Sequence, residues 1–377
     1  MAGASPIEWT DATWNPVVGC SIDTPGCINC YAMPMARRIE AMTAALKLSG
    51  ATGAPHYDGT TRVVKGKAVW TGKLALAPDH ILTEPLTWKK PRRIFVNSMG
   101  DLFHEDAPDE WIDRVFAVMA LCPQHTFQVL TKRSARMREY FAGRRANFGR
   151  ASDILHEMNH WLPEPRHEAA VNRLDIFDSL GKPLPNVWLG VSAEDQARAD
   201  RRIPDLLATP ATVRFVSAEP LIGPIDFYRT SAAMTASPHP WRNGPILQGI
   251  DWIIVGGESG PKARPMHPAW ARRIRDQCAA AGVPFFFKQW GSIGEWNPRC
   301  PSHPRPDMAF AEDGRTWTDF NDIPFHTPVV FLKRMPKSRA GRLLDGTEHN
   351  GFPAGRPSAT REAGGGGAEG DGGGLWT

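Results

Sequence analysis

Six short apolar runs alternate with amphipathic segments through the middle of this chain of 377 residues. The runs are apolar throughout, which is typical of parallel strands buried on both faces. Most are separated by a segment with helical periodicity, such as the one that places Trp270, Ile274 and Cys278 on one face. Repeated strand–helix units predict an α/β fold, a partial or full (β/α) TIM-like barrel. The runs cover residues 93–97, 126–130, 186–191, 213–216, 252–255 and 284–287.

Each run ends in small residues followed by charged or amide side chains. The carboxyl ends of the strands in a parallel barrel surround one mouth, where active sites lie. Six endings of the same kind therefore predict a shared polar pocket. The residues are Asn97, Asp101, Lys132, Arg133, Glu194, Asp195, Glu219, Glu258, Lys288 and Gln289.

Some of these endings suggest roles in binding. Lys132 and Arg133 suit a substrate phosphate or a cofactor carboxylate, the arginine through a two-pronged contact. The alternative is a salt bridge from this pair to Glu194 or Glu219 across the mouth. Glu219 and Glu258 suit ribose hydroxyls or substrate, and we group Lys132, Arg133, Glu219, Glu258 and Lys288 as candidate catalytic residues.

Three of the six cysteines, Cys20, Cys27 and Cys30, are clustered in the spacing C-x6-C-x2-C. Thiolates are soft metal ligands, and two that are separated by two residues can bend round one centre. Three thiolates are one short of a closed zinc site or a four-cysteine cluster. Either a fourth ligand comes from elsewhere, for example His104 in a structural zinc site, or one position stays open for chemistry. Such clustering favours metal binding in a reducing compartment, hence the cytoplasm.

Composition limits the remaining possibilities. A net charge of +4 allows nucleic acid as a partner without arguing for it. Trp70, Trp88 and Trp290 lie near basic residues and suit either base stacking or core packing. We find neither a signal peptide nor an apolar stretch long enough to cross a bilayer, so no membrane partner is expected.

We expect one domain over residues 1–350, with insertions near 48–71, 143–185 and 228–250. A Pro-rich region follows Trp290. The Gly-rich tail, residues 351–377, has too little apolar content to fold and is expected to be disordered.

The stretch from Asn15 to Ala32 resembles the cluster-binding loop of radical S-adenosylmethionine enzymes, in the version N-P-x-x-G-C … G-C-x-x-C-Y-A seen in relatives of spore photoproduct lyase. The resemblance implies a partial or full (β/α) barrel in which this loop follows the first strand. It implies that Cys20, Cys27 and Cys30 hold a 4Fe–4S cluster whose open iron is chelated by S-adenosylmethionine. An electron from a donor then cleaves that cofactor to a 5′-deoxyadenosyl radical, which abstracts hydrogen from the substrate.

The same resemblance suggests cofactor-binding residues. Tyr31, beside the last cysteine, is expected to contact the adenine side. Residues 97–101 follow the early strand and lie nearest to where the amino group of the cofactor is held, so Asn97, Ser98 and Asp101 are candidates, together with Glu194. Gly256-Gly257-Glu258 matches the G-G-E motif of the superfamily but follows a late strand, and that role is not transferred. The first cysteine gap also departs from the common pattern C-x3-C-x2-C.

Nearly the whole ordered length is also similar to a phage-associated family of uncharacterised function, through residues 9–16, 95–104, 130–133 and 287–291. The sequence thus predicts a radical S-adenosylmethionine enzyme, with a nucleic acid or nucleotide as a possible substrate. Two alternatives stay open: a zinc-containing protein that binds nucleic acid without redox chemistry, and a metal-dependent barrel hydrolase.

Overall fold

The computed structural model describes residues 5, 7–144, 183–228, 246–299 and 305–354. Its centre is a sheet of seven strands that are all parallel and lie in chain order. Each strand therefore pairs with the next along the chain, as in a (β/α) barrel. The strands are β1 (Ala12–Trp14), β6 (Arg93–Val96), β7 (Thr126–Thr131), β8 (Val187–Ser192), β9 (Val213–Ala218), β10 (Trp252–Gly256) and β11 (Phe285–Gln289).

The sheet is open, because β1 and β11 do not pair with each other. The structure is thus a half-barrel, which confirms the predicted α/β class and the partial form of the barrel. All six apolar runs became strands, and the short β1 precedes the cysteine loop.

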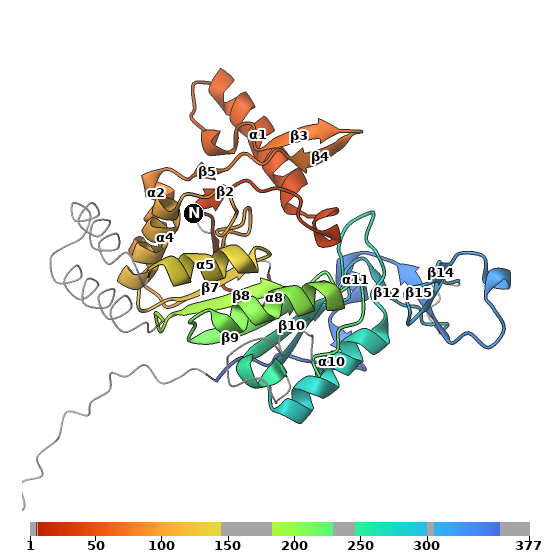
Figure 1. Cartoon of the computed structure of the whole chain (residues 1–377). Coiled ribbons are helices and arrows are strands. Elements are labelled where there is room, and N and C mark those ends of the chain that lie inside the picture. Colours follow the sequence, from red (N-terminus) through yellow and green to blue (C-terminus); the bar gives the residue numbers. More distant parts are fainter. Residues whose placement is uncertain (1–4, 6, 145–182, 229–245, 300–304, 355–377) are drawn as a thin grey trace, which may run out of the picture.

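Four helices cover the outer face of the half-barrel (Figure 1). They are α4 (Asp109–Leu121), α5 (Ser134–Arg144), α8 (Gln196–Ala208) and α10 (Pro268–Ala281). On α4, Ile112, Val115 and Phe116 are buried in one cluster with Ile94 and Phe127 of the sheet. Burial of one such side chain stabilises the fold by about 1.5–3 kcal/mol.

The inner face of the sheet is filled by aromatic side chains at a second cluster, which includes Trp9, Phe215, Trp252 and Phe286. A Cβ on Gly190 of β8 would lie 2.5 Å from the ring of Phe215, so this strand needs glycine there.

The segment around residue 352 completes this aromatic cluster. Phe352 packs on Trp252 with 4.9 Å between ring centroids, and the Trp252 indole donates to the Gly351 carbonyl at 2.7 Å. Gly351 and Phe352, which the sequence analysis included in the tail, therefore pack against the barrel. The rest of the tail, 355–377, lies outside the described residues.

Residues 48–71, which the sequence marked as an insertion, contain a β-hairpin. Helix α1 (Ala32–Leu48) is followed by a hairpin of β3 (Thr61–Val64) and β4 (Lys67–Trp70), and the hairpin packs on the helix. The buried carboxylate of Glu40 on α1 accepts hydrogen bonds from the amide and hydroxyl of Thr61 at 2.9 and 2.8 Å. The hairpin thus depends on a helix partner that a local sequence pattern does not reveal.

The Pro-rich region after Trp290 is also folded where it is described. It forms an antiparallel sheet in the order β12-β15-β13-β14, a structure that the sequence interpretation missed. Its strands are β12 (Ile293–Glu295), β13 (Met308–Ala311), β14 (Thr316–Trp317) and β15 (Val329–Arg334).

The other short elements connect these parts. The two later predicted insertions, 143–185 and 228–250, lie mostly outside the described residues, at 145–182 and 229–245. No helix in the described parts is long and apolar enough to cross a membrane. The short elements are β2 (Val17–Val18), β5 (Ala75–Leu76), α2 (Asp79–Leu82), α3 (Glu84–Thr87), α11 (Lys337–Ala340), β16 (Leu343–Leu344), β17 (Thr347–Glu348), η1 (Pro25–Cys27), η2 (Pro55–Tyr57), η5 (Ile246–Gly249) and η6 (Phe320–Asp322).

Candidate functional site

The cysteine loop, residues 20–31, begins just after β1 and β2 and ends where α1 starts. Gly19 sets its entry, with φ at +91°. A Cβ at Gly19 would lie 2.0 Å from the carbonyl oxygen of Lys73, so both the conformation and the space require glycine. The loop therefore leaves the first strand in a fixed direction.

Between and beside its cysteines, this loop touches the carboxyl ends of four strands. Ser21 bonds to Arg133 after β7, Thr24 to Glu194 after β8, Asn29 to Glu258 after β10, and Tyr31 to Ser98 after β6. The contacts are Arg133 Nη2 to Ser21 Oγ at 2.9 Å, the Thr24 hydroxyl to Glu194, Asn29 Nδ2 to Glu258 Oε2 at 3.0 Å, and the Tyr31 hydroxyl to the Ser98 carbonyl at 3.0 Å. The cysteine loop thus lies across the mouth of the half-barrel, where the sequence predicted a shared polar pocket.

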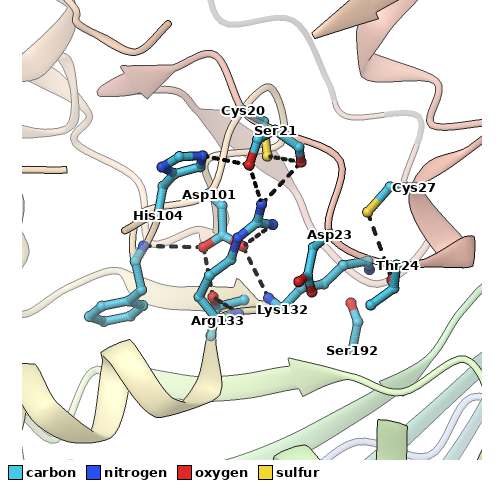
Figure 2. A network of polar contacts seen from close by, with 12 residues as sticks. Cys20, Ser21, Asp23, Thr24, Cys27, Asp101, His104, Lys132, Arg133 and Ser192 are labelled. Carbon is cyan, nitrogen blue, oxygen red and sulfur yellow. Dashed lines mark hydrogen bonds and ion pairs between the residues drawn. The ribbon is translucent and has the colours of Figure 1, made fainter. Parts of the chain in front are cut away.

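Arg133 connects this loop to the sheet (Figure 2). Its guanidinium donates to the Ser21 carbonyl at 3.0 Å and pairs with the Asp101 carboxylate at 3.4 Å. Burial alone would lower the pKa of Arg133, but the negative charges around it, that of Asp101 first, together outweigh burial and raise the pKa. A salt bridge to Glu194 or Glu219 was one of the two roles left open for Arg133, and it does not form among the described residues, because the turn after β6 brings Asp101 closer.

Asp101 is fully engaged in holding the turns after β6 and β7. Its Oδ1 accepts from the Thr131 hydroxyl at 2.6 Å and the Phe103 amide at 3.1 Å, and its Oδ2 accepts from the Lys132 amide at 3.0 Å. With Arg133 added, the buried carboxylate has four donors. The arrangement makes Asp101 a positioning residue.

His104 supports the same loop as a neutral ring. Burial lowers its pKa, with the charge of Arg133 adding to the effect. Its Nδ1 accepts from the Asp106 amide at 3.1 Å, so the proton lies on Nε2, which donates to Ser21 Oγ at 2.8 Å. Both ring nitrogens are occupied within the fold.

Glu194 is fully buried beside the loop. Its Oε2 pairs with Arg202 on α8 at 2.8 Å, and the same guanidinium pairs with Asp23 at 2.8 Å. Burial raises the pKa of Glu194, but the charges of Lys132 and Arg202 and the hydrogen bond from Thr24 together outweigh burial, so the pKa is lowered and the group is ionised. Asp23 and Arg202 were missed in the sequence, because nothing local marks a helix arginine as a partner of a distant loop.

The remaining carboxylates of the mouth are also paired. Lys288 Nζ lies 2.8 and 3.0 Å from the Glu219 oxygens, and Gln289 Nε2 lies 3.3 Å from Glu219 Oε1. Glu258 accepts from the Nε of Arg264 at 2.9 Å. Burial raises the pKa of Glu258, but hydrogen bonds from Arg264 and Asn29 outweigh it and the net pKa is lowered.

Lys132 differs from these residues. It is half-buried, and its ammonium makes no hydrogen bond or ion pair with the described residues. Its charge nevertheless helps to lower the pKa of Glu194, and at Cys30 it opposes the burial that raises the pKa of that thiol. The ammonium of Lys132 thus lies near Glu194 and Cys30 without bonding to either.

The turn after β6 is shaped by residues 15 and 97. The Asn15 Oδ1 accepts from Ser98 Oγ at 3.0 Å and from the Met99 amide at 2.9 Å. Asn97 adopts φ of +60° and its Oδ1 accepts from the Val17 amide at 3.2 Å. Its Nδ2 is buried and unpartnered among the described residues, so one donor of this turn is available.

The three clustered thiols are free and lie within electrostatic range of one another. Burial raises the pKa of Cys20 to about 12, with the neighbouring thiols adding to the effect, and burial raises the pKa of Cys30 as well. Cys20 and Cys30 pack against the apolar cluster that includes Met33 and Met99. A metal would therefore replace the thiol protons on binding, next to the cations Arg133 and Lys132.

Among the described residues, no three His, Cys, Asp or Glu side chains are drawn together tightly enough to hold a single metal ion. A cubane cluster is larger than one ion and spaces its cysteine sulfurs more widely. The donor set of three soft thiols near two cations fits such a cluster. Cys122 and Cys278 are buried in the core of the half-barrel.

The three tryptophans considered for base stacking are buried, so they pack in the core. Ser21, Thr24 and Asn29 were missed as site residues. Their only signal in the sequence was their place between the cysteines.

Fold and site together define a class: an open α/β half-barrel whose mouth is crossed by a three-cysteine loop. The chain belongs to the family described as "Protein of unknown function (DUF5131)", whose model matches residues 4–353. A search of curated proteins gave no match. The predicted phage association stays a prediction.

Two solved structures match the chain weakly. One is described as spore photoproduct lyase complexed with dinucleoside spore photoproduct, with 9% identity over 74% of this chain and a TM-score of 0.32. The match spans 63% of that lyase chain, less than two thirds of its length. The other is a mutant of spore photoproduct lyase, with 9% identity, a TM-score of 0.31, and coverage of 89% of this chain and 71% of that one. Both TM-scores are too low to assign a function to this chain.

Proposed function

We propose that this protein is a radical S-adenosylmethionine-type enzyme in which Cys20, Cys27 and Cys30 hold a 4Fe–4S cluster. The observation that supports it best is the position of the cysteine loop, which follows the first strand and is fixed to the ends of four others. That position brings a three-thiolate ligand set to the face where barrel enzymes carry out chemistry. Three thiolates leave one iron open for an exogenous ligand.

When bound, the cluster and S-adenosylmethionine supply a 5′-deoxyadenosyl radical that takes a hydrogen atom from the substrate. The protein's residues hold and orient these groups. Tyr31 is fixed by its bond to Ser98 and presents its ring beside Cys30. The polar end of S-adenosylmethionine carries an amino and a carboxylate group. The Asn97 side chain, whose Nδ2 is unpartnered, and the Lys132 ammonium suit this end of the cofactor.

Arg133, Asp101 and Glu194 act as positioning residues in this proposal. Each is buried and bonded on several sides, so each fixes the loop that carries the thiols. Glu219, paired with Lys288, and Glu258 lie at the late strands and suit the substrate side. A nucleic acid or nucleotide substrate is a part of the proposal that rests on the resemblance of the cysteine loop and on the predicted phage association. The proposed place in the cytoplasm rests on the clustering of the cysteines.

The two alternatives are less well supported. A zinc site completed by His104 requires a free ring nitrogen, yet both nitrogens bond within the fold. A metal-dependent hydrolase requires free carboxylates at the mouth, whereas Asp101, Glu194, Glu219 and Glu258 each pair with a cation.

The proposal is tested by adding S-adenosylmethionine and dithionite to the anaerobic protein and measuring 5′-deoxyadenosine by liquid chromatography. We expect formation by the wild type, loss in Cys27→Ala, and retention in the control Cys278→Ala, whose thiol lies on α10. Equal product in Cys27→Ala and the wild type, or none in an iron-loaded wild type, contradicts the proposal.

A further inference from the structure

The first cysteine gap, residues 21–26, is bound to the mouth of the half-barrel along most of its length. Four of its six residues make contacts there, which is more than a gap of three residues contains. The four are Ser21, Asp23, Thr24 and Gly26, and their partners are Arg133, Arg202 and Glu194. The departure from the common three-residue gap therefore has a physical reason, because the longer gap supplies these contacts.

Arg202 holds the centre of this gap from helix α8. Its Nη2 pairs with Asp23 at 2.8 Å, and its Nη1 donates to Glu194 at 2.8 Å and to the Ser192 carbonyl at 2.9 Å. One guanidinium therefore joins the cysteine gap, the end of β8 and α8. Its planar fork fixes the direction of both carboxylates, which the point charge of a lysine does not do.

The burial of Arg202 is not explained by the stability of the fold. The side chain is 1% exposed and lies on the inward side of α8 with Ala199, Ile203 and Leu206. Its Nε is buried without a partner among the described residues, which costs free energy. An apolar side chain at such a position often stabilises a fold as well as a buried ion pair does. The charge of Arg202 is better explained by the groups that it positions.

The contacts continue from Glu194 to the sulfur of Cys27. The Thr24 hydroxyl, which donates to Glu194, lies 3.9 Å from Cys27 Sγ, within hydrogen-bonding distance of a sulfur (Figure 2). A Cβ on Gly26 would lie 2.8 Å from Glu194 Oε1, so the backbone just before Cys27 lies against that carboxylate. The Cys27 amide in turn donates to the Thr24 carbonyl at 2.9 Å. The position of Cys27 thus depends on Glu194, which Arg202 holds.

We propose that Arg202 is a positioning residue that holds Cys27 in its ligand position before a metal binds. This role rests on the proposed function, because the group that Cys27 would ligate is the cluster named there. The other two cysteines are held by separate contacts, through Ser21 and Asn29. Loss of the Arg202 contacts should therefore loosen residues 23–27 first.

The test is hydrogen–deuterium exchange of the full-length protein, measured by mass spectrometry after treatment with a chelator. Arg202→Lys keeps the charge and loses the fork. Asp23→Asn removes only the pair with the loop, at a residue that is 22% exposed, and leaves the pair of Arg202 with Glu194. We expect the amides of residues 23–27 to exchange about tenfold faster or more in both variants, because local opening then breaks fewer bonds. The amides of β6 and α10 should exchange as in the wild type.

Arg198→Lys is the matched control, because Arg198 lies on the same helix and pairs with Asp195, outside the cysteine loop, at 3.1 Å. Its exchange at residues 23–27 should stay within about twofold of the wild type. A second measurement uses the iron-loaded proteins. The rate at which a chelator removes iron should rise about threefold or more in Asp23→Asn, at a urea midpoint close to that of the wild type.

The positioning role is overturned if residues 23–27 exchange as slowly in both variants as in the wild type, or if all parts of the chain exchange faster to the same degree. Equal rates of iron removal from Asp23→Asn and the wild type also overturn it. A protein that binds no iron but shows the local change in exchange refutes the proposed function and keeps the fixed position of Cys27. An iron-loaded protein without that change refutes the positioning alone.

Discussion

The most informative single change is Arg133→Met. It removes the guanidinium that joins the cysteine loop to the sheet, at distances of 2.9 and 3.0 Å to Ser21 and 3.4 Å to Asp101. The side chains of Arg133 and Asp101 are only 3% and 7% exposed, so the aspartate is left as a buried charge without its partner. Breaking such a pair costs about 3–5 kcal/mol in the free energy of unfolding.

Urea unfolding followed by circular dichroism measures this loss as a shift of the midpoint at unchanged slope. Arg133→Lys keeps the charge but loses hydrogen bonds to Ser21, so we expect a smaller loss of about 1–3 kcal/mol. In the double variant with Asp101→Asn, part of the loss is recovered, because the unpaired carboxylate is removed, and the two changes couple by about 1 kcal/mol or more.

The control is Arg273→Met, whose partner Glu312 is 47% exposed. An exposed ion pair contributes less than about 1 kcal/mol. If Arg133→Met costs no more than this control, the argument that Arg133 and Asp101 hold the loop in place is refuted.

Other changes test separate parts of the structure. In Gly257→Ala, the added Cβ would lie 2.0 Å from the Trp290 carbonyl oxygen, and we expect a loss of about 3 kcal/mol or more in urea unfolding; a loss below about 1 kcal/mol argues against this close approach. His267 caps α10 by accepting from the Ala269 amide at 3.1 Å, and burial lowers its pKa, so the unfolded state takes up the proton first and stability falls as the pH drops below about 6.5. His267→Asn keeps a neutral cap, and its unfolding free energy should therefore fall less than that of the wild type between pH 7 and pH 5. If both proteins lose the same unfolding free energy over this range, His267 is not the titrating cap. Lys132→Met should lower the urea midpoint only modestly, because the ammonium makes no bond and acts on the buried Glu194 through its charge alone. It should weaken S-adenosylmethionine binding by about tenfold through loss of a charge-assisted contact; unaltered affinity excludes that role.

The half-barrel could be predicted because its strands are buried on both faces. The runs at 93–97 and 252–255 are apolar without alternation, and β6 and β10 formed there. The helix with Trp270 and Ile274 was likewise marked by its periodicity. These are local signals that the tertiary structure reinforced.

What escaped prediction depends on partners distant in sequence. The β3–β4 hairpin has few buried residues of its own and is held by Glu40 from α1. Phe352 lies in a Gly-rich stretch that reads as disordered, but it packs on Trp252. A Gly-rich composition predicts disorder for the stretch as a whole and cannot reveal a single packing contact of this kind.

The site was predicted in outline and not in its pairings. The strand-end pattern placed polar residues at one mouth, because parallel strands end on the same side. It could not say that Arg133 pairs with Asp101, since several carboxylates meet there and only the turn after β6 decides the distance. Ser21, Thr24 and Asn29 gain their importance from the loop's path, which becomes visible only in three dimensions.

The central claim, a cluster held by Cys20, Cys27 and Cys30, is tested most directly by metal analysis. The protein is purified anaerobically, and its iron, acid-labile sulfide and zinc are determined alongside a triple cysteine-to-alanine variant. The account predicts about four iron and four sulfide per chain in the wild type and almost none in the variant. A colourless wild-type protein that carries one zinc and no sulfide contradicts it.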